Sequence, residues 1–383
     1  MLLLGATNFI HYNEFRLTLR PINKYIKLLA VALVASFLNA YYHNWFSLQL
    51  LRHAYIFIQS IGLLIIIINI FKEKNDLFNS IKRIFIAASI ACVIFIIAAL
   101  FQGSDIIINR RIMMPFAGYS LNAFALFFGP YIVLGVSFLW MSHSFFPKKT
   151  LLILCLSSLI IGLLITQSRG GWFAVLASTM YFFSKKRYYK GIIIIVVLII
   201  IISAFQIFRG ILSSRLAQIS TGDLSLLARI SLWRVAIGVI KKHFLFGVGV
   251  NNFINIKYQF GFPRFLDPIK AFNTHNLFLE VLVNLGIIGF IGFFGLIRNA
   301  LSKLTRIIKT QQNNDISILS LGLQCAIYTF LIHGLVDCGL YLNMVFFNYM
   351  IIIGFSWAVI KLTEKNYTSV TNLNSENYNY KKL

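Results

Sequence analysis

Long apolar runs separated by short polar connectors dominate the pattern along this chain. The most extreme run, Gly191 to Ser203, has the sequence GIIIIVVLIIIIS, which is more apolar than the core of a soluble protein requires. An apolar stretch of about 20 residues spans a bilayer as an α-helix. The pattern therefore predicts an all-α polytopic membrane protein with about ten transmembrane helices. They lie near Tyr25–Tyr41, Leu48–Phe71, Ile84–Phe101, Tyr119–Met141, Leu151–Thr166, Gly171–Phe183, Gly191–Phe208, Asn276–Ile297, Ile316–Leu335 and Gly339–Ile360.

Basic connectors set the predicted orientation of these helices. Lys and Arg accumulate in the N-terminal segment, in the C-terminal tail, and in the connectors 72–83, 142–150, 185–190 and 298–309. Because connectors rich in Lys and Arg stay in the cytoplasm, both termini are predicted to be cytoplasmic and the number of spans to be even. The long connector at about 209–275 is then a large loop on the periplasmic side.

The predicted domain organisation is simple. Residues 1–360 form a single integral membrane domain, and residues 361–383, rich in Asn, Tyr, Ser and Lys, form a polar, disordered cytoplasmic tail. Within the large loop, apolar residues recur every three or four positions, which is typical of an amphipathic helix lying on the outer membrane surface. This helix is predicted from Ala228 to His243, with an apolar stripe of Ile230, Trp233, Ile237, Ile240 and Phe244.

Composition and charge narrow the classes of function. Of the 383 residues, 58% are hydrophobic and 12% are charged, and the formal net charge is +24. Nucleic-acid binding is disfavoured, because the excess charge sits in membrane connectors and not on a soluble face interleaved with aromatic residues. The four cysteines form no C-x-x-C motif, and the eleven acidic residues include no D-x-D motif near the outer face. We therefore expect a site without a metal ion or cofactor.

Arg169 is the first candidate site residue. It lies in the segment Thr166–Trp172 (TQSRGGW), at the outer turn between two predicted spans. The two glycines after it let backbone and ligand approach closely, and free N–H groups at the start of the next helix favour an anion. A guanidinium here suits a phosphate group, which it can hold with two hydrogen bonds. The alternative is an interfacial arginine whose head group simply reaches the membrane surface.

Further arginines are predicted on the same side of the membrane. Arg229 stands at the start of the amphipathic helix, and Arg215 precedes it in the loop. Arg229 would reach inward to a ligand or pair with lipid phosphate. Arg110 and Arg111 form an outer pair before the fourth predicted span, where contact with an anionic head group and anchoring to lipid are equal alternatives.

His275 is the candidate base. It follows the large loop and immediately precedes an apolar run, so that it faces water at the membrane interface, where the neutral imidazole is accessible near pH 7. Nearby arginines would favour the neutral form, which can accept a proton. His333 and Asp337 are four residues apart near the outer end of the ninth predicted span and share a helix face. They are expected to support the site or relay protons, with a structural hydrogen bond as the alternative.

Four motifs together resemble one family of membrane proteins. They are Gln167–Gly171 (QSRGG), Ala228–Trp233 (ARISLW), Phe246–Phe253 (FGVGVNNF) and Thr274–Glu280 (THNLFLE), followed by Gly286 and Gly289. Their order and spacing, over about Arg110 to Ile297, resemble the O-antigen ligase and O-antigen polymerase superfamily. His275, Asn276, Leu279 and Gly286 match its histidine signature. Each motif alone is weak, but the set is specific.

The resemblance implies a fold and an activity. The fold would be that of a GT-C-like membrane glycosyltransferase, with about ten spans here where the family usually has twelve. The donor would be an undecaprenyl-diphosphate-linked glycan, and the acceptor lipid A-core for a ligase or another lipid-linked repeat unit for a polymerase. Arg169, Arg229 and Arg215 would bind the diphosphate, and His275 would activate the acceptor hydroxyl. Arg111, His333 and Asp337 are candidates for support around them.

The sequence leaves the choice of acceptor open. The first hypothesis is a ligase of the bacterial inner membrane, and the alternative is a polymerase with the same fold. A polysaccharide transporter or flippase would place charges in mid-span, paired across helices. The candidate charges here gather at one face, which favours an enzyme whose partners are the lipid-linked glycan, its acceptor and membrane lipids.

Overall fold

The structure is a computed structural model that describes residues 22–102, 111–112, 119–142, 145–146, 148–191, 193, 221–265, 273–311, 314–340 and 342–380. Side chains are not described at 111, 112, 119, 221–226 and 365–380. Regular structure in these parts is helical except for two-residue strands β1 (Arg111–Ile112) and β2 (Tyr119–Ser120), which pair antiparallel. The helices are α2 (Asn23–Tyr42), α3 (Leu48–Ile70), α4 (Lys74–Gln102), α6 (Leu121–Phe138), α7 (Lys149–Ile165), α8 (Arg169–Lys185), α10 (Thr221–Lys242), α11 (Phe253–Ile256), α12 (Leu277–Thr310), α13 (Asp315–His333) and α14 (Asn343–Tyr380).

The helices confirm the predicted all-α polytopic membrane fold. Among the described residues, seven helices are long and apolar enough to cross a membrane, namely α2, α3, α4, α6, α12, α13 and the Asn343–Glu364 part of α14. The two spans predicted to be short correspond to α7 and α8, each of 17 residues. The span predicted at Gly191–Phe208 lies almost wholly outside the described residues, so the count of ten stays a prediction. Helix α14 continues to Tyr380, through most of the segment predicted to be a disordered tail.

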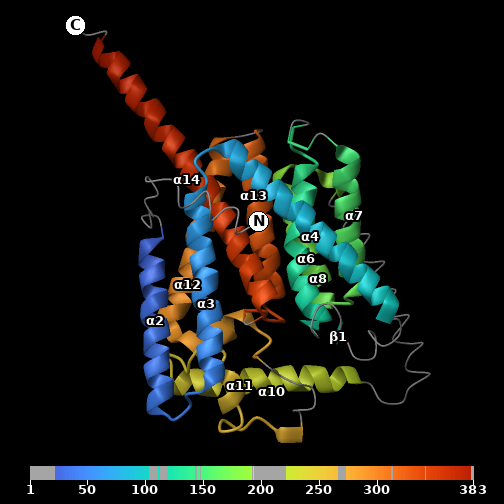
Figure 1. Ribbon diagram of the computed structural model, residues 1–383, viewed down its shortest axis with the longest axis vertical. Helices are drawn as coiled ribbons and strands as arrows, with labels where there is room; N and C mark the ends of the chain where they lie inside the picture. Colours follow the sequence, from blue (N-terminus) through green and yellow to red (C-terminus); the bar gives the residue numbers. More distant parts are fainter. Residues whose placement is uncertain are drawn as a thin grey trace.

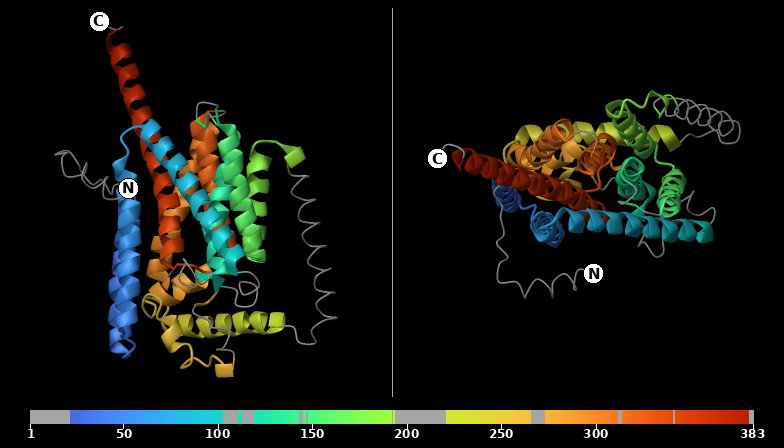
Figure 2. Two further views of the ribbon diagram at one scale, coloured as in Figure 1. Left: turned by 45° about the vertical axis from the view of Figure 1, so that its right-hand side comes forward. Right: turned by 90° about the horizontal axis from the view of Figure 1, so that it is seen from above.

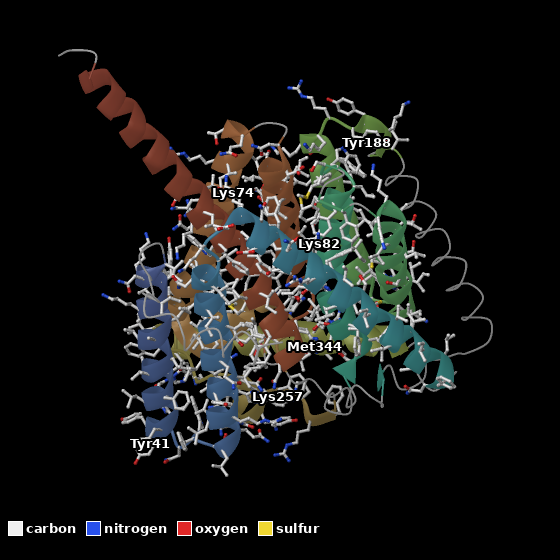
Figure 3. All side chains as sticks on the ribbon, turned by 45° about the horizontal axis from the view of Figure 1, so that its top comes forward. Tyr41, Lys74, Lys82, Tyr188, Lys257 and Met344 are labelled. Carbon is white, nitrogen blue, oxygen red and sulfur yellow. The ribbon has the colours of Figure 1, made fainter. Side chains whose placement is uncertain are left out.

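One end of the bundle is closed by a helix that runs across it. Figure 1 shows α10 lying roughly perpendicular to the other helices, with α11 beside it, while the end of α14 projects from the opposite end. The two further views in Figure 2 show the same arrangement. In Figure 3, Tyr41, Lys257 and Met344 lie toward the end with α10, and Lys74, Lys82 and Tyr188 lie toward the other end. The connectors near Lys74, Lys82 and Tyr188 are therefore remote from α10.

Helix α13 is the centre of the packing around the end that α10 covers. It packs against α6, α8, α12 and α14. Small residues permit this closeness: a Cβ atom added to Gly129 of α6 would lie 3.1 Å from Thr329 Cγ2 of α13 and 3.2 Å from Val175 Cγ2 of α8. Close approach through small residues is the usual basis of helix association in lipid. It brings the ends of α6, α8 and α13 together.

Helix α12 is broken at Gly286, where φ is 64° and ψ is −171°. Only glycine adopts this conformation readily. The break frees backbone groups that an intact helix would pair internally, and the chain after α10 pairs with them instead. The three hydrogen bonds are Val248 N to Val283 O at 3.0 Å, Gly249 N to Asn284 O at 3.0 Å, and Ile287 N to Phe244 O at 2.8 Å.

A turn at Gly247–Gly249 explains the glycines around it. Gly247 and Gly249 both have positive φ, at 69° and 99°. A Cβ atom on Gly247 would lie 2.5 Å from Asn284 O, and one on Gly286 would lie 2.3 Å from Leu245 O. The two backbones are therefore in direct contact, and the outer segment that follows α10 is fixed to the first part of α12.

Helix α10 exists as predicted, but its protein-facing side differs from the predicted apolar stripe. Its buried residues are Ala228, Leu232, Val235, Ala236 and Val239, which pack against Val248, Phe253, Ile256, Phe262 and Val283. From the predicted stripe, Ile230, Ile237 and Phe244 are exposed by 43%, 47% and 47%. Ala228 and Ala236 let α10 pack closely on the folded loop, and Ile230, Ile237 and Phe244 are left on the outside.

Candidate active site

His275 lies at the end of the bundle covered by α10, in the turn that enters α12. Its φ of 50° places it in the left-handed region, which is uncommon for a residue other than glycine. Its Nδ1 atom lies 3.0 Å from Oδ1 of Asp337. The His275 side chain is 26% exposed, whereas that of Asp337 is only 8% exposed. Because Nδ1 is held by the carboxylate, Nε2 is the ring nitrogen left to act on a substrate.

Asp337 is held by hydrogen-bond donors on several sides. Asn122 Nδ2 donates to its Oδ2 at 2.7 Å, and the backbone N–H of Cys338 donates to its Oδ1 at 2.8 Å. Burial opposes ionisation of this carboxyl, but the neighbouring His275 imidazole and these hydrogen bonds outweigh burial and hold the pKa of Asp337 below its usual range. The carboxylate is therefore ionised at neutral pH and fixed in orientation.

Two asparagines fix the turn that carries His275. Asn273 Oδ1 accepts from the backbone N–H of His275 at 2.8 Å, and its Nδ2 donates to Cys338 O at 2.9 Å. Asn276 is the N-cap of α12, since its Oδ1 accepts from the N–H groups of Phe278 and Leu279, each at 3.0 Å. Its Nδ2 donates to Leu335 O at 3.0 Å. The turn is thus tied to the connection between α13 and α14, where Asp337 lies.

The turn between α7 and α8 carries Arg169 and lies at the same end of the bundle. Ser168 caps α8 by accepting from Gly171 N at 3.3 Å, and its Oγ lies 3.4 Å from His333 Nε2. Arg169, the first residue of α8, is exposed. The glycines expected to let a ligand approach are instead packed on protein, since a Cβ atom on Gly170 would lie 3.2 Å from His333 Cδ2. Because these glycines have no side chain, the start of α8 packs directly against α13.

Arg229 approaches from α10. It is partly buried and lies within electrostatic reach of the His333 ring. One turn further along the helix, Trp233 Nε1 donates to Thr274 O at 2.9 Å. The helix that carries Arg229 is therefore hydrogen-bonded to the residue immediately before His275.

The structure thus brings five of the predicted site residues to one end of the bundle: Arg169, Arg229, His275, His333 and Asp337. Arg215 lies outside the described residues, and Arg111 is described only as backbone in β1. One expectation is refined. Helix α13 ends at His333, so Asp337 lies beyond the helix, and its carboxylate pairs with His275 while the His333 ring meets Ser168.

Sequence reasoning missed the residues that hold the candidate base. Asn122 and Asn273 were given no role, and Glu280 was noted only as an acid near the outer face. Asn122 is a polar residue in the first turn of an otherwise apolar helix. Asn273 immediately precedes the histidine motif. A polar group at the end of an apolar span is the signal that could have identified them, because such a group needs a partner at the membrane interface.

The arrangement combines an oriented imidazole with cations that lack protein partners. Across the described part of the chain, neither Arg169 nor Arg229 forms a hydrogen bond or ion pair. The same residues contain no group of three or more His, Cys, Asp or Glu side chains suited to a metal ion. A general base beside free guanidiniums can accept a proton from a nucleophile while the guanidiniums bind an anionic leaving group.

Comparison with known families agrees with the motifs and the geometry. No curated protein matches the chain significantly. Residues 151–294 match the family model described as O-antigen ligase. This range contains Arg169, Arg229, His275 and the broken first part of α12. Together with the apolar helices, the match is typical of a multi-pass membrane protein whose residues 151–294 are similar to O-antigen ligases.

Proposed function

We propose that this protein is an O-antigen ligase-like glycosyltransferase of the inner membrane. It moves a glycan from undecaprenyl diphosphate to a lipid A-core acceptor at the periplasmic face. The observation that carries the proposal is the His275–Asp337 pair, 3.0 Å apart, beside arginines that have no partner among the described residues. The family match supports the lipid-linked glycan as the substrate class.

His275 acts as the general base. The acceptor hydroxyl oxygen attacks the anomeric carbon of the donor glycan as His275 Nε2 takes the hydroxyl proton. The bond from the anomeric carbon to the diphosphate oxygen breaks, and the diphosphate leaves with the bonding electron pair. This displacement inverts the anomeric configuration. Asp337 keeps the proton of the neutral ring on Nδ1 and stabilises the imidazolium that forms, as a carboxylate does behind other catalytic histidines.

The arginines bind the diphosphate. Arg169 and Arg229 approach the site from α8 and α10, and Arg215, which lies outside the described residues, is proposed to join them. A guanidinium offers paired donors that match phosphate oxygens. In a site partly shielded from water, such donors stabilise the negative charge that develops on the leaving group. They take the place of the metal ion that many glycosyltransferases use.

Glycan transfer by the purified protein in detergent or nanodiscs tests the proposal. With a labelled undecaprenyl-diphosphate glycan as donor and lipid A-core as acceptor, His275→Ala should lower kcat by about 10²–10⁴-fold. His43→Ala, which changes an exposed histidine at the same end of the bundle, is the matched control and should retain activity. Near-normal transfer by His275→Ala would overturn the assignment of the base, and loss of transfer with EDTA would argue for a metal.

The polymerase is the second candidate, because the same geometry serves a lipid-linked acceptor equally well. Deletion of the gene, followed by gel analysis of lipopolysaccharide, distinguishes the two. Loss of all O-antigen from the core indicates a ligase, whereas core that carries a single repeat unit indicates a polymerase. A flippase makes no new bond, so any transfer product in the purified system excludes that function.

A further inference from the structure

The backbone of Thr274, immediately before His275, is held at both of its peptide groups. Its N–H donates to Glu280 Oε2 at 2.7 Å, and its C=O accepts from Trp233 Nε1 at 2.9 Å. Thr274 and Glu280 are both fully buried. The two bonds come from different elements, since Glu280 belongs to the first turn of α12 and Trp233 belongs to α10.

Glu280 is an unusual residue in this place. A buried carboxyl group is costly unless hydrogen bonds replace the water that it loses. Both oxygens of Glu280 accept hydrogen bonds, from Thr274 N and from Asn284 Nδ2 at 2.8 Å, and none of the ion pairs among the described residues includes it. A glutamine here could accept at only one of the two positions. The carboxyl group is therefore suited to holding two donors at once.

Asn284 extends the connection to the turn that follows α10. Its Oδ1 accepts from the backbone N–H of Phe253 at 3.3 Å, and its own backbone C=O accepts from Gly249 at 3.0 Å. Glu280 thus joins the turn before His275 to the segment fixed against the broken part of α12. Trp233 joins the same turn to the helix of Arg229.

The conformation of His275 needs such support. A left-handed backbone costs about 1–2 kcal/mol for a residue other than glycine. The conformation persists only where neighbouring groups determine it. The Thr274–His275 peptide, whose C=O accepts from Trp233, is next to the φ angle of His275, and the preceding peptide, whose N–H donates to Glu280, fixes the turn that leads into it. Together they set the direction in which the imidazole leaves the backbone.

We propose that Glu280 and Trp233 are positioning residues that hold the two peptide groups of Thr274, so that Nε2 of His275 faces the substrate. The inference rests on the proposed function, because it assigns to these residues the placement of the base. Neither residue touches the reacting atoms. Their effect passes through the orientation of His275.

The first test uses Glu280→Gln and Trp233→Phe in the full-length protein. Trp233→Phe removes the hydrogen bond to Thr274 O and keeps an aromatic ring, and Glu280→Gln removes one of the two hydrogen bonds that the carboxyl group accepts while keeping the size of the side chain. Displacement of a catalytic group by about 1 Å can cost about 10²-fold in rate. We expect kcat to fall by about 10–10²-fold with the KM for the donor little changed. Trp45→Phe is the matched control, because its indole also donates one hydrogen bond, to Gln259 Oε1 at 3.0 Å, away from the turn.

The second test separates positioning from general stabilisation. Both substitutions are repeated in a His275→Ala background, where no base remains to be positioned. Groups that act as a unit are strongly non-additive. We therefore expect each substitution to cost less than about threefold in that background, measured with a sensitive labelled donor. If Glu280→Gln fails to fold, Trp233→Phe, which keeps an aromatic ring in place, carries the test alone.

The possible failures are distinguishable. Near-normal transfer by His275→Ala alone would overturn the proposed function. If His275→Ala is inactive as expected but Glu280→Gln and Trp233→Phe retain full kcat, the positioning role is wrong. It is equally wrong if their losses multiply fully with that of His275→Ala, since a structural defect would act independently of the base.

Discussion

The two halves of the site are built in opposite ways. On the side of the base, His275 is held by Asp337 and its backbone N–H by Asn273. On the side of the cations, neither Arg169 nor Arg229 has a hydrogen bond or ion pair within the described residues. The protein therefore fixes the group that must take a proton from a defined direction. Within the described residues, it leaves the two arginines unpaired, so that the charge of a ligand can pair with them.

This difference has a physical basis. General-base catalysis depends on a precise angle and distance between the nitrogen and the proton, so the imidazole gains from being fixed before the substrate arrives. An arginine already paired with a carboxylate would bind a diphosphate weakly, because that pair would have to break first. A free guanidinium keeps its whole hydrogen-bonding capacity for the phosphate. Substitutions that act only on the base or only on the arginines test this difference.

Asp337→Asn should have the largest effect. The amide can present its NH₂ group to Nδ1, which favours the ring tautomer with its proton on Nε2, and that nitrogen can then no longer accept a proton. We expect kcat for glycan transfer to fall by about 10²–10⁴-fold, as for loss of the base itself. The KM for the donor should change little, because the arginines are untouched. A variant with more than a third of wild-type kcat would show that the base needs no carboxylate.

Arg169→Ala and Arg229→Ala should have the next largest effect, with a different signature. Each removes a donor to the diphosphate, which should lower kcat by about 10²–10³-fold and raise the KM for the donor. Because no hydrogen bond or ion pair with the described residues is lost, the thermal melting temperature should change little. Arg→Lys variants should recover only part of the activity, because lysine keeps the charge but loses the paired donors. A lowered melting temperature with normal transfer would mean that the arginines serve the fold.

Gly286→Ala tests the scaffold that both halves share. The φ of 64° and ψ of −171° cost about 1–3 kcal/mol for a residue with a side chain. The new Cβ atom would also lie 2.3 Å from Leu245 O. We expect a clear fall in melting temperature and loss of transfer. Gly62→Ala in α3 is the control, since nothing lies within 4 Å of its Cβ position, and alanine there should be neutral or slightly stabilising.

The smallest expected effect is a dependence of stability on pH. The pKa of Asp337 is lower in the folded protein than its unfolded value of about 3.9. The carboxylate therefore contributes stability that is fully present above that value and is lost as the pH falls through it toward the folded pKa. The difference in melting temperature between wild type and Asp337→Asn should be constant from pH 7 to about 5 and shrink toward pH 3. A difference that stays the same throughout would contradict the pairing.

The membrane-spanning helices are the part of the fold that could be predicted from the sequence. Within a bilayer, a helix satisfies its own backbone hydrogen bonds, so long apolar runs locate the spans directly. The same reasoning could not tell which face of α10 meets protein. Ile230 and Val235 are equally apolar, and only packing decides that Val235 is buried while Ile230 remains exposed.

The site was predictable residue by residue but not as a set of contacts. The motifs marked Arg169, Arg229 and His275 by residue type and place. The pairing of His275 with Asp337, which are 62 residues apart, arises only when α12 and α13 pack together. Helical spacing suggested instead that Asp337 would lie on one face with His333, but α13 ends at His333 and the chain turns away.

The break in α12 has a consequence for how the protein is made. In the segment after α10, Phe244, Val248 and Gly249 find backbone partners in Ile287, Val283 and Asn284, which the ribosome produces later, and the carboxylate for His275 comes later still. A nascent chain that ends before residue 337 would contain every candidate arginine and the histidine but could not orient its base. Activity would therefore arise only once the α13–α14 connection has emerged, so that truncated chains left in the membrane would transfer little glycan.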